Sequence, residues 1–278
     1  MGAGTNFAML IFYQNLNPIL QALIAGCFAW ALTALGAATV FLAKDIKGRF
    51  MDMMLGFAAG VMTAAIFFSL LSPSIQISKS LNVLVWIPPL VGFVAGGLFM
   101  LAFDKLLPHL HLGLSVDHAE GITTHWKRTI LLVLAMTLHN FPEGLAIGVA
   151  FGALASGSSV ATLLSAITLA IGIGIQDFPE GLAVSIPLRK AGLPRWKSFW
   201  YGQLTGIVEP LGAVVAAAAV MSITGLLPFA LSFAAGCMLY IVVEELIPEA
   251  QLSENTDWAT IGTLVGFSLM MVLEIVLG

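Results

Sequence analysis

The sequence predicts an all-α membrane protein in which eight transmembrane helices form one bundle. Of its 278 residues, 59% are hydrophobic and only 9% are charged, whereas about 25% of the residues in a soluble domain are charged. The apolar residues also gather into eight stretches, each close to the roughly 20 residues that a helix needs to cross a bilayer. We therefore expect residues 1–278 to form a single transmembrane domain. The net charge of −4 argues against a nucleic-acid partner.

The expected spans are separated by connections that contain charges or turn residues. The first connection reads KDIKGR and the fourth reads SGSS, and both compositions are typical of loops. Only the third connection, residues 104–128, is long. The spans are expected at residues 18–43, 53–72, 84–103, 129–152, 160–187, 200–221, 227–247 and 258–277.

The basic residues predict how the bundle is oriented. Ten of the eleven lie in the first, third and fifth connections, and the even-numbered connections contain only Lys79. Because loops on the cytoplasmic side carry an excess of Lys and Arg, the odd-numbered connections are expected to be cytoplasmic. Eight spans then place both termini on the extracytoplasmic side. The ten residues are Lys44, Lys47, Arg49, Lys105, Lys127, Arg128, Arg189, Lys190, Arg195 and Lys197.

A repeated polar motif interrupts the fourth and fifth spans. HNFPEGLA at 139–146 is repeated almost letter for letter by QDFPEGLA at 176–183. An acid inside a membrane costs at least a few kcal/mol, so each copy indicates a functional site. The two glutamates, Glu143 and Glu180, are one helix and one loop apart, so the two helices are expected to run antiparallel and bring both copies to the same depth.

Helical spacing predicts how each copy presents its polar groups. The first residue and the glutamate are four apart and therefore share a face, and the second residue lies about 100° further round. The fourth residue, Pro142 or Pro179, cannot donate to the carbonyl four residues back, and we expect it to kink its helix. The copies offer His139, Asn140, Glu143, Gln176, Asp177 and Glu180.

The balance of charge points to a metal ion. Glu209 in the sixth span adds another acid, and no Lys or Arg occurs between Thr129 and Leu188. Buried carboxylates this close are either largely protonated or neutralised by a multivalent cation. Imidazole, amide and carboxylate ligands together suit borderline divalent ions such as Zn²⁺, Fe²⁺ or Mn²⁺. A lone glutamate is also explained by a hydrogen bond between helices, but two repeated blocks with Glu209 favour a functional site.

Further polar residues lie near the expected ends of the spans. One set falls on the cytoplasmic side and could receive an ion that leaves the central site; it comprises Asp104, His109, His111, Glu244, Glu245 and Glu249. The third connection adds His118, Glu120 and His125, each of which is also explained as a solvated residue. Glu274, near the outer end of the last span, is either an entrance acid or an interfacial one.

These motifs resemble the ZIP family of zinc and iron transporters, and most closely its bacterial branch. The resemblance covers nearly the whole chain and rests on DMMLGFAAG at 52–60, the two PEG blocks, EPLG at 209–212 and EELIPE at 244–249. It implies a bundle of eight helices whose fourth and fifth members hold a binuclear metal site. One ion would be held by His139, Glu143, Gln176, Glu180 and Met62, and the other by Asn140, Asp177 and Glu209, with both glutamates bridging. Many members carry His where this chain has Gln176.

The resemblance and the residues together predict a transporter rather than an enzyme. The expected substrate is Zn²⁺, with Cd²⁺, Fe²⁺ and Mn²⁺ as further candidates, moved toward the cytoplasm across a bacterial inner membrane. The family also suggests a homodimer and a metal-binding third loop. The alternative is an intramembrane metal hydrolase, which would use HExxH, but His139 is the single intramembrane histidine and Pro142 interrupts the spacing. A metal-stabilised structural or sensing protein is a third reading.

Overall fold

The structure, a computed structural model, is helical throughout. It describes residues 12–43, 45–81, 83–110, 117, 120–157, 159–223, 225–252 and 256–278. Among these residues the only strand-like pairing is an isolated bridge between His109 and Glu120. In the part of the chain that the structure describes, eight helices are long and apolar enough to cross a membrane, as predicted. They span Pro18–Phe41, Gly48–Ser78, Ile87–Leu106, Arg128–Ser156, Leu163–Lys190, Arg195–Ser222, Leu227–Ala250 and Thr256–Leu277.

Several of these spans are built from more than one helical segment. The segments are α2 (Pro18–Ala38) with η1 (Thr39–Phe41), α3 (Gly48–Ala65) with η2 (Ile66–Leu71) and α4 (Ser72–Ser78), α5 (Ile87–Leu106), α6 (Arg128–Gly152) with η4 (Ala153–Ser156), α7 (Leu163–Lys190), α8 (Arg195–Leu204) with η5 (Thr205–Ile207) and α9 (Val208–Ser222), α10 (Leu227–Ile241) with η6 (Val242–Leu246) and α11 (Ile247–Ala250), and α12 (Thr256–Leu277).

The second span differs most from its predicted bounds, because it begins five residues earlier and ends six residues later than 53–72. Its two ends are polar, so an apolar window alone does not include them. Between α3 and α4 lies the π-helical turn η2, just before Pro73. A second π-helical turn, η6, precedes Pro248 in α11 in the same way. A wider turn accommodates a proline that has no N–H to donate, and such turns are often found at functional sites.

The helices divide into two groups according to which of them pack along one another. In the first group, α2 packs along α7 and α9, and α6 packs along α9, with α8 beside α2 and α7. In the second group, α3 packs along α12, and α5 packs along α10. The groups meet mainly where α3 contacts α7 and where α6 contacts α10. Helices α6 and α7 are the most deeply buried of the eight spans.

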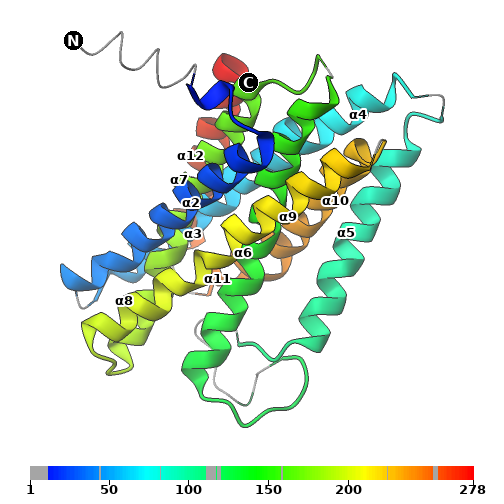
Figure 1. Cartoon of the computed structure of the whole chain (residues 1–278). Helices are drawn as coiled ribbons and strands as arrows, with labels where there is room; N and C mark the ends of the chain where they lie inside the picture. The colour runs from blue at the N-terminus through cyan, green and yellow to red at the C-terminus, as the bar shows by residue number, and fades with distance from the viewer. Residues whose placement is uncertain are drawn as a thin grey trace, which may run out of the picture.

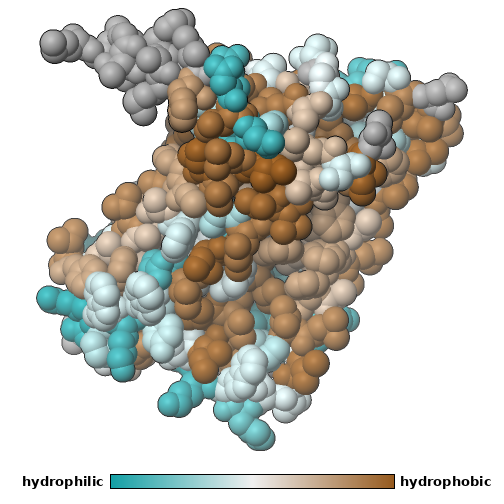
Figure 2. Space-filling view, in the orientation of Figure 1, coloured by the Kyte–Doolittle hydropathy of each residue, from teal (hydrophilic) through white to brown (hydrophobic). Residues whose placement is uncertain are grey.

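The surface matches a protein that lies in a bilayer. Figure 2 shows a face that is apolar over most of its middle, with hydrophilic atoms gathered toward its upper and lower edges. The start of α2 and the end of α12 lie at the same end of the bundle, opposite the connection between α5 and α6 (Figure 1). At that opposite end Asp45 of the first connection pairs with Lys190 at the end of α7. The chain is therefore a multi-pass membrane protein.

The two prolines of the repeated motif do not interrupt their helices. Pro142 lies inside α6 and Pro179 inside α7, and both helices continue through them without a break. A bend at either position stays a prediction.

Candidate metal centre

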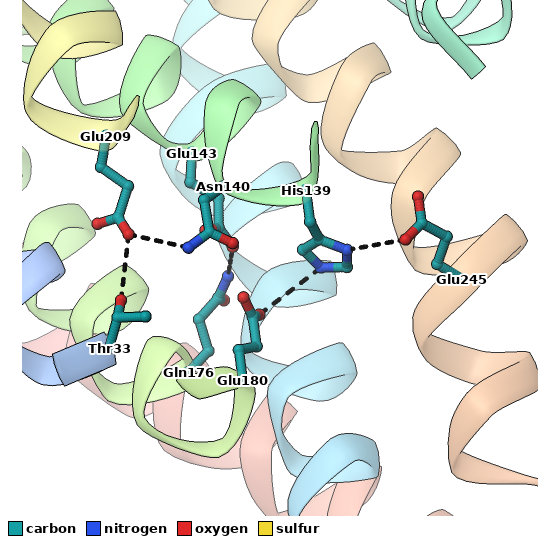
Figure 3. A network of polar contacts seen from close by, with 8 residues as sticks. All are labelled: Thr33, His139, Asn140, Glu143, Gln176, Glu180, Glu209 and Glu245. Atoms are coloured by element: carbon teal, nitrogen blue, oxygen red, sulfur yellow. Dashed lines mark hydrogen bonds and ion pairs between the residues drawn. The ribbon is translucent and has the colours of Figure 1, made fainter. Parts of the chain in front are cut away.

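The two copies of the repeated motif meet in the interior of the bundle (Figure 3). They lie on α6 and α7, and a further acid comes from the first turn of α9. Every one of these residues is at most 1% exposed, although all of them are polar or ionisable. The set comprises His139, Asn140, Glu143, Gln176, Asp177, Glu180 and Glu209.

One part of the cluster is formed by His139, Glu143 and Glu180. Each of these residues offers a ligand atom, and the three atoms lie within 4.8 Å of one another. The Nε2 atom of His139 is 3.6 Å from Oε1 of Glu180. Gln176 donates a hydrogen bond from its amide to Oε1 of Glu143. The residues four apart in each copy thus contribute to one place, as their spacing suggests.

The other part of the cluster is formed by Glu143, Asp177 and Glu209, whose ligand atoms also lie within 4.8 Å of one another. Glu143 belongs to both parts. Glu180 lies in the first part, where its carboxylate is beside His139, and its role as a second bridge stays a prediction. Asn140 donates a hydrogen bond from Nδ2 to Oε1 of Glu209 over 3.1 Å.

The cluster has more buried acceptors than donors. Glu143 and Glu209 each have one carboxylate oxygen without a hydrogen-bond partner, and Asp177 and Glu180 each have two. Among the described residues, the only basic side chain that forms an ion pair with these four acids is His139. Unpaired charge in a low-dielectric interior is strongly unfavourable. The arrangement is therefore suited to a multivalent cation.

A glycine brings the backbones of two of these helices together. A Cβ atom at Gly144 would lie 2.7 Å from the Cα atom of Glu209, so any larger residue would push α9 away from α6. The glycine of the PEG motif thus sets how far the carboxylate of Glu209 reaches into the cluster.

The second helix group reaches the cluster through one side chain, that of Glu245. Oε2 of Glu245, in the π-helical turn η6, is 3.5 Å from Nδ1 of His139. Met62 is fully buried in α3, which packs against α7. The part of the cluster around Asp177 and Glu209, by contrast, draws its side chains from helices of the first group.

The residues expected on the cytoplasmic side are partly brought together. Asp104 in the last turn of α5, His109 and Glu120 offer ligand atoms within 4.8 Å of one another, and Nε2 of His109 is 3.1 Å from Oδ1 of Asp104. His109 and Glu120 also exchange backbone hydrogen bonds. Glu249 is buried, whereas Glu244 is exposed. His111 and His118 lie outside the described residues.

Glu274 lies at the opposite end of the bundle. Ser69 of η2 donates a hydrogen bond to its Oε1 atom, which joins α12 to the second span. The side chain is therefore held within the second helix group.

Protonation of the buried imidazole of His109 makes the free energy of unfolding depend on pH. Burial lowers the pKa of His109, but the hydrogen bonds to Asp104 and to the carbonyl of Leu107 and the charges of Asp104 and Glu245 outweigh it and raise the pKa to about 9. Since this folded pKa lies above the ordinary value of 6.5 for an imidazole, the stabilisation is complete below the unfolded pKa and is lost as the pH rises through about 9.

We expect His109→Gln to lower the melting temperature of the detergent-purified chain at about pH 6 but not at about pH 10. The shift should be at least about 2–4 °C, which corresponds to about 1 kcal/mol. His125→Gln, at an exposed position of the same connection, is the control and should have no effect at either pH. An equal loss at both pH values for His109→Gln would contradict the role of the imidazolium.

Sequence reasoning did not single out one residue of this region. Thr33 of α2 is fully buried and donates from Oγ1 to Oε1 of Glu209 over 3.1 Å. A threonine in an apolar helix is common, and no pattern in the sequence relates residue 33 to residue 209. Only the packing of α2 against α9 reveals the contact.

Several acids buried together in membrane helices typically mark a binding site or a pathway for cations. A transporter of divalent metal ions is the class of protein that this fold and this cluster define.

Comparison with known proteins gives the family. The model of the ZIP zinc transporter family matches residues 115–274. The chain is 39% identical to zinc transporter ZIP11 of Homo sapiens over an alignment that covers 95% of this chain and 99% of the relative. It is 36% identical to zinc transporter GufA of Myxococcus xanthus, over 92% of this chain and 98% of the relative. It is 37% identical to zinc transporter ZIPB of Bordetella bronchiseptica, over 95% and 84%.

The chain therefore belongs to the ZIP family of zinc transporters, as the motifs predict. It transports a divalent metal ion, Zn²⁺, and is not an enzyme. The reading as an intramembrane hydrolase has no support from any of these relatives.

Proposed function

We propose that the chain moves Zn²⁺ toward the cytoplasm through a binuclear site halfway across the membrane. The observation that carries the proposal is the buried cluster in which two sets of ligand atoms, each within 4.8 Å, share Glu143. Two divalent ions would neutralise four carboxylates, and a shared carboxylate is a common way to hold two ions close together.

The ligands of the two ions follow from the two parts of the cluster. We assign His139, Glu143, Gln176 and Glu180 to the first ion, with Met62 as a further ligand from α3, and Asn140, Asp177 and Glu209 to the second. Zinc accepts nitrogen, oxygen and sulfur ligands. Cd²⁺, Fe²⁺ and Mn²⁺ are proposed as competing substrates, because neutral Gln176 makes the first set less selective than a second imidazole would.

Polar groups on either side of the centre provide a path. We assign Glu274 to the entrance. On the cytoplasmic side, Glu245 lies beside His139, and the cluster of Asp104, His109 and Glu120 lies at the end of α5. An ion released from the first set would thus meet a carboxylate at each step. His111, His118, Glu244 and Glu249 are proposed as further ligands near the exit.

Alternating access is proposed to occur by movement of one helix group against the other. Within each group, glycines let backbones touch: a Cβ at Gly152 would meet Cα of Ala217 at 3.0 Å, and one at Gly96 would meet the backbone nitrogen of Cys237 at 3.0 Å. Among the described glycines, the one that faces the other group is Gly172, which meets the flexible side chain of Met270. Tight contacts within groups and side-chain contacts between them favour motion of each group as a unit.

The remaining assignments concern the membrane and the assembly. We propose a plasma-membrane protein, a bacterial inner-membrane protein in a bacterial cell, with both termini extracytoplasmic. The location of the basic residues supports this orientation. The chain would form one transmembrane domain, surrounded by lipid, and would assemble as a homodimer.

Flux in liposomes tests the proposal. The purified chain should carry Zn²⁺ into sealed proteoliposomes loaded with a fluorescent zinc indicator, and the uptake should saturate with Zn²⁺ concentration. Added Cd²⁺, Fe²⁺ or Mn²⁺ should compete. Saturable binding of Zn²⁺ without uptake above that of empty liposomes would point to the sensing or structural alternative and would overturn the proposal.

A further inference from the structure

Thr33 differs from three threonines in other membrane spans in where its hydroxyl points. The hydroxyls of Thr63, Thr137 and Thr263 return to the carbonyl four residues back in their own helices, at 2.6, 2.7 and 3.0 Å. The equivalent distance for Thr33 is 3.4 Å, whereas its Oγ1 is 3.1 Å from Oε1 of Glu209. A hydroxyl has one proton to donate, and a bond to a carboxylate is stronger than one to a neutral carbonyl.

Two donors converge on the same oxygen of Glu209. Asn140 of α6 donates to Oε1 from one side and Thr33 of α2 donates from the other, each over 3.1 Å (Figure 3). The other oxygen, Oε2, is buried and has no hydrogen-bond partner. The two donors therefore fix the rotation of the carboxylate and leave Oε2 as the atom available to an ion.

A glycine leaves room for this arrangement. A Cβ atom at Gly206, in the turn η5 just before α9, would lie 2.7 Å from Oε1 of Glu209 and 2.9 Å from Oγ1 of Thr33. Any side chain at this position would therefore press on the same two atoms. The backbone of the sixth span and the side chain from α2 thus fit one another around a single carboxylate oxygen.

We infer that Thr33 is a positioning residue for the second metal ion. It orients the carboxylate of Glu209 through a hydrogen bond and so strengthens binding at Asn140, Asp177 and Glu209, with little effect on the ion held by His139. The inference rests on the binuclear site of the proposed function. Groups that orient metal ligands typically change affinity by about 10- to 100-fold when they are removed.

The test measures the binding of two Zn²⁺ ions, one after the other, to the purified full-length chain by calorimetry. In Thr33→Val we expect the affinity of one of the two sites to fall by about 10-fold or more. We assign this weakened site to Asn140, Asp177 and Glu209. The affinity of the other site should change by less than about threefold. Thr33→Ser retains the hydroxyl and should restore binding. If Thr33 acted through packing alone, the affinity would fall in Thr33→Ser, which loses a methyl group, and not in Thr33→Val, which keeps the shape of threonine.

Controls separate the inference from other causes. Thr63→Val makes the same chemical change where the hydroxyl bonds within its own helix, and should leave both affinities unchanged. Gly206→Ala crowds Oε1 of Glu209 and should lower the affinity for the same ion. This variant keeps the test available if Thr33→Val does not fold. If the wild type binds two ions, and Thr33→Val and Gly206→Ala bind both of them as tightly as the wild type does, the inference is wrong. If the wild type binds a single ion, the binuclear site itself is wrong, and the inference fails with it.

Discussion

Replacement of Glu143 by glutamine should reduce Zn²⁺ flux in proteoliposomes by at least about 100-fold. Glu143 is the carboxylate that belongs to both parts of the cluster, so its replacement removes a negatively charged ligand from both metal sites at once. Removal of one partner from a buried charge pair costs about 3–5 kcal/mol, and every 1.4 kcal/mol is tenfold in an equilibrium constant. Glu180→Gln should have a comparable effect, because Glu180 lies beside His139 in the first part.

A second measurement separates loss of function from loss of fold. Glutamine has the shape of glutamate and removes like-charge repulsion from the metal-free cluster, since nearby carboxylates in a low dielectric repel one another. The metal-free Glu143→Gln protein should therefore melt at the same temperature as the wild type or above it, while the stabilisation by added Zn²⁺ should be smaller. Asp257→Asn, at an exposed acid in the first turn of α12, is the control. Unchanged flux in both glutamine variants would refute the assignment of the central site.

The parts of this centre that could be predicted are those that depend on short stretches of sequence. Residues four apart on a helix share a face whatever surrounds them, so His139 and Glu143 could be paired from the sequence. The eight spans followed from apolar length alone, because lipid requires a continuous helix of hydrophobic residues. The absence of lysine and arginine around the repeated motif identified an excess of negative charge that a cation would balance.

Contacts between distant segments could not be predicted in the same way. Thr33 and Glu209 are joined by the packing of α2 on α9, and nothing in either helix specifies that partner. Glu245 was expected near the exit, but it lies in the π-helical turn η6 with its Oε2 atom 3.5 Å from Nδ1 of His139. Such turns shift the face that later residues present, so spacing rules that assume a regular α-helix do not apply across them.

Cross-linking the two helix groups should stop transport. On a background with Cys27→Ser and Cys237→Ala, the pair Gly172→Cys and Met270→Cys joins α7 to α12. A Cβ atom at residue 172 would lie 3.9 Å from Cγ of Met270, the atom whose place a cysteine sulfur would take. We expect a disulfide or a bridging mercury ion to join the two cysteines after a small adjustment. If one group must move against the other, oxidation should reduce Zn²⁺ uptake to the level of empty liposomes, and a reductant should restore it.

A pair of cysteines within one group makes this result specific. A Cβ atom at Gly152 of α6 would lie 3.2 Å from Cβ of Val220 in α9, and both helices belong to the first group. Cross-linking Gly152→Cys to Val220→Cys should leave uptake within about twofold of the reduced protein, because a unit that moves as one body is not hindered by an internal bond. Full uptake with the α7–α12 bond intact would instead mean that the ions pass without relative movement of the groups at this contact. The two double variants thus distinguish a carrier, in which bodies of packed helices alternate, from a pore that stays fixed while ions cross it.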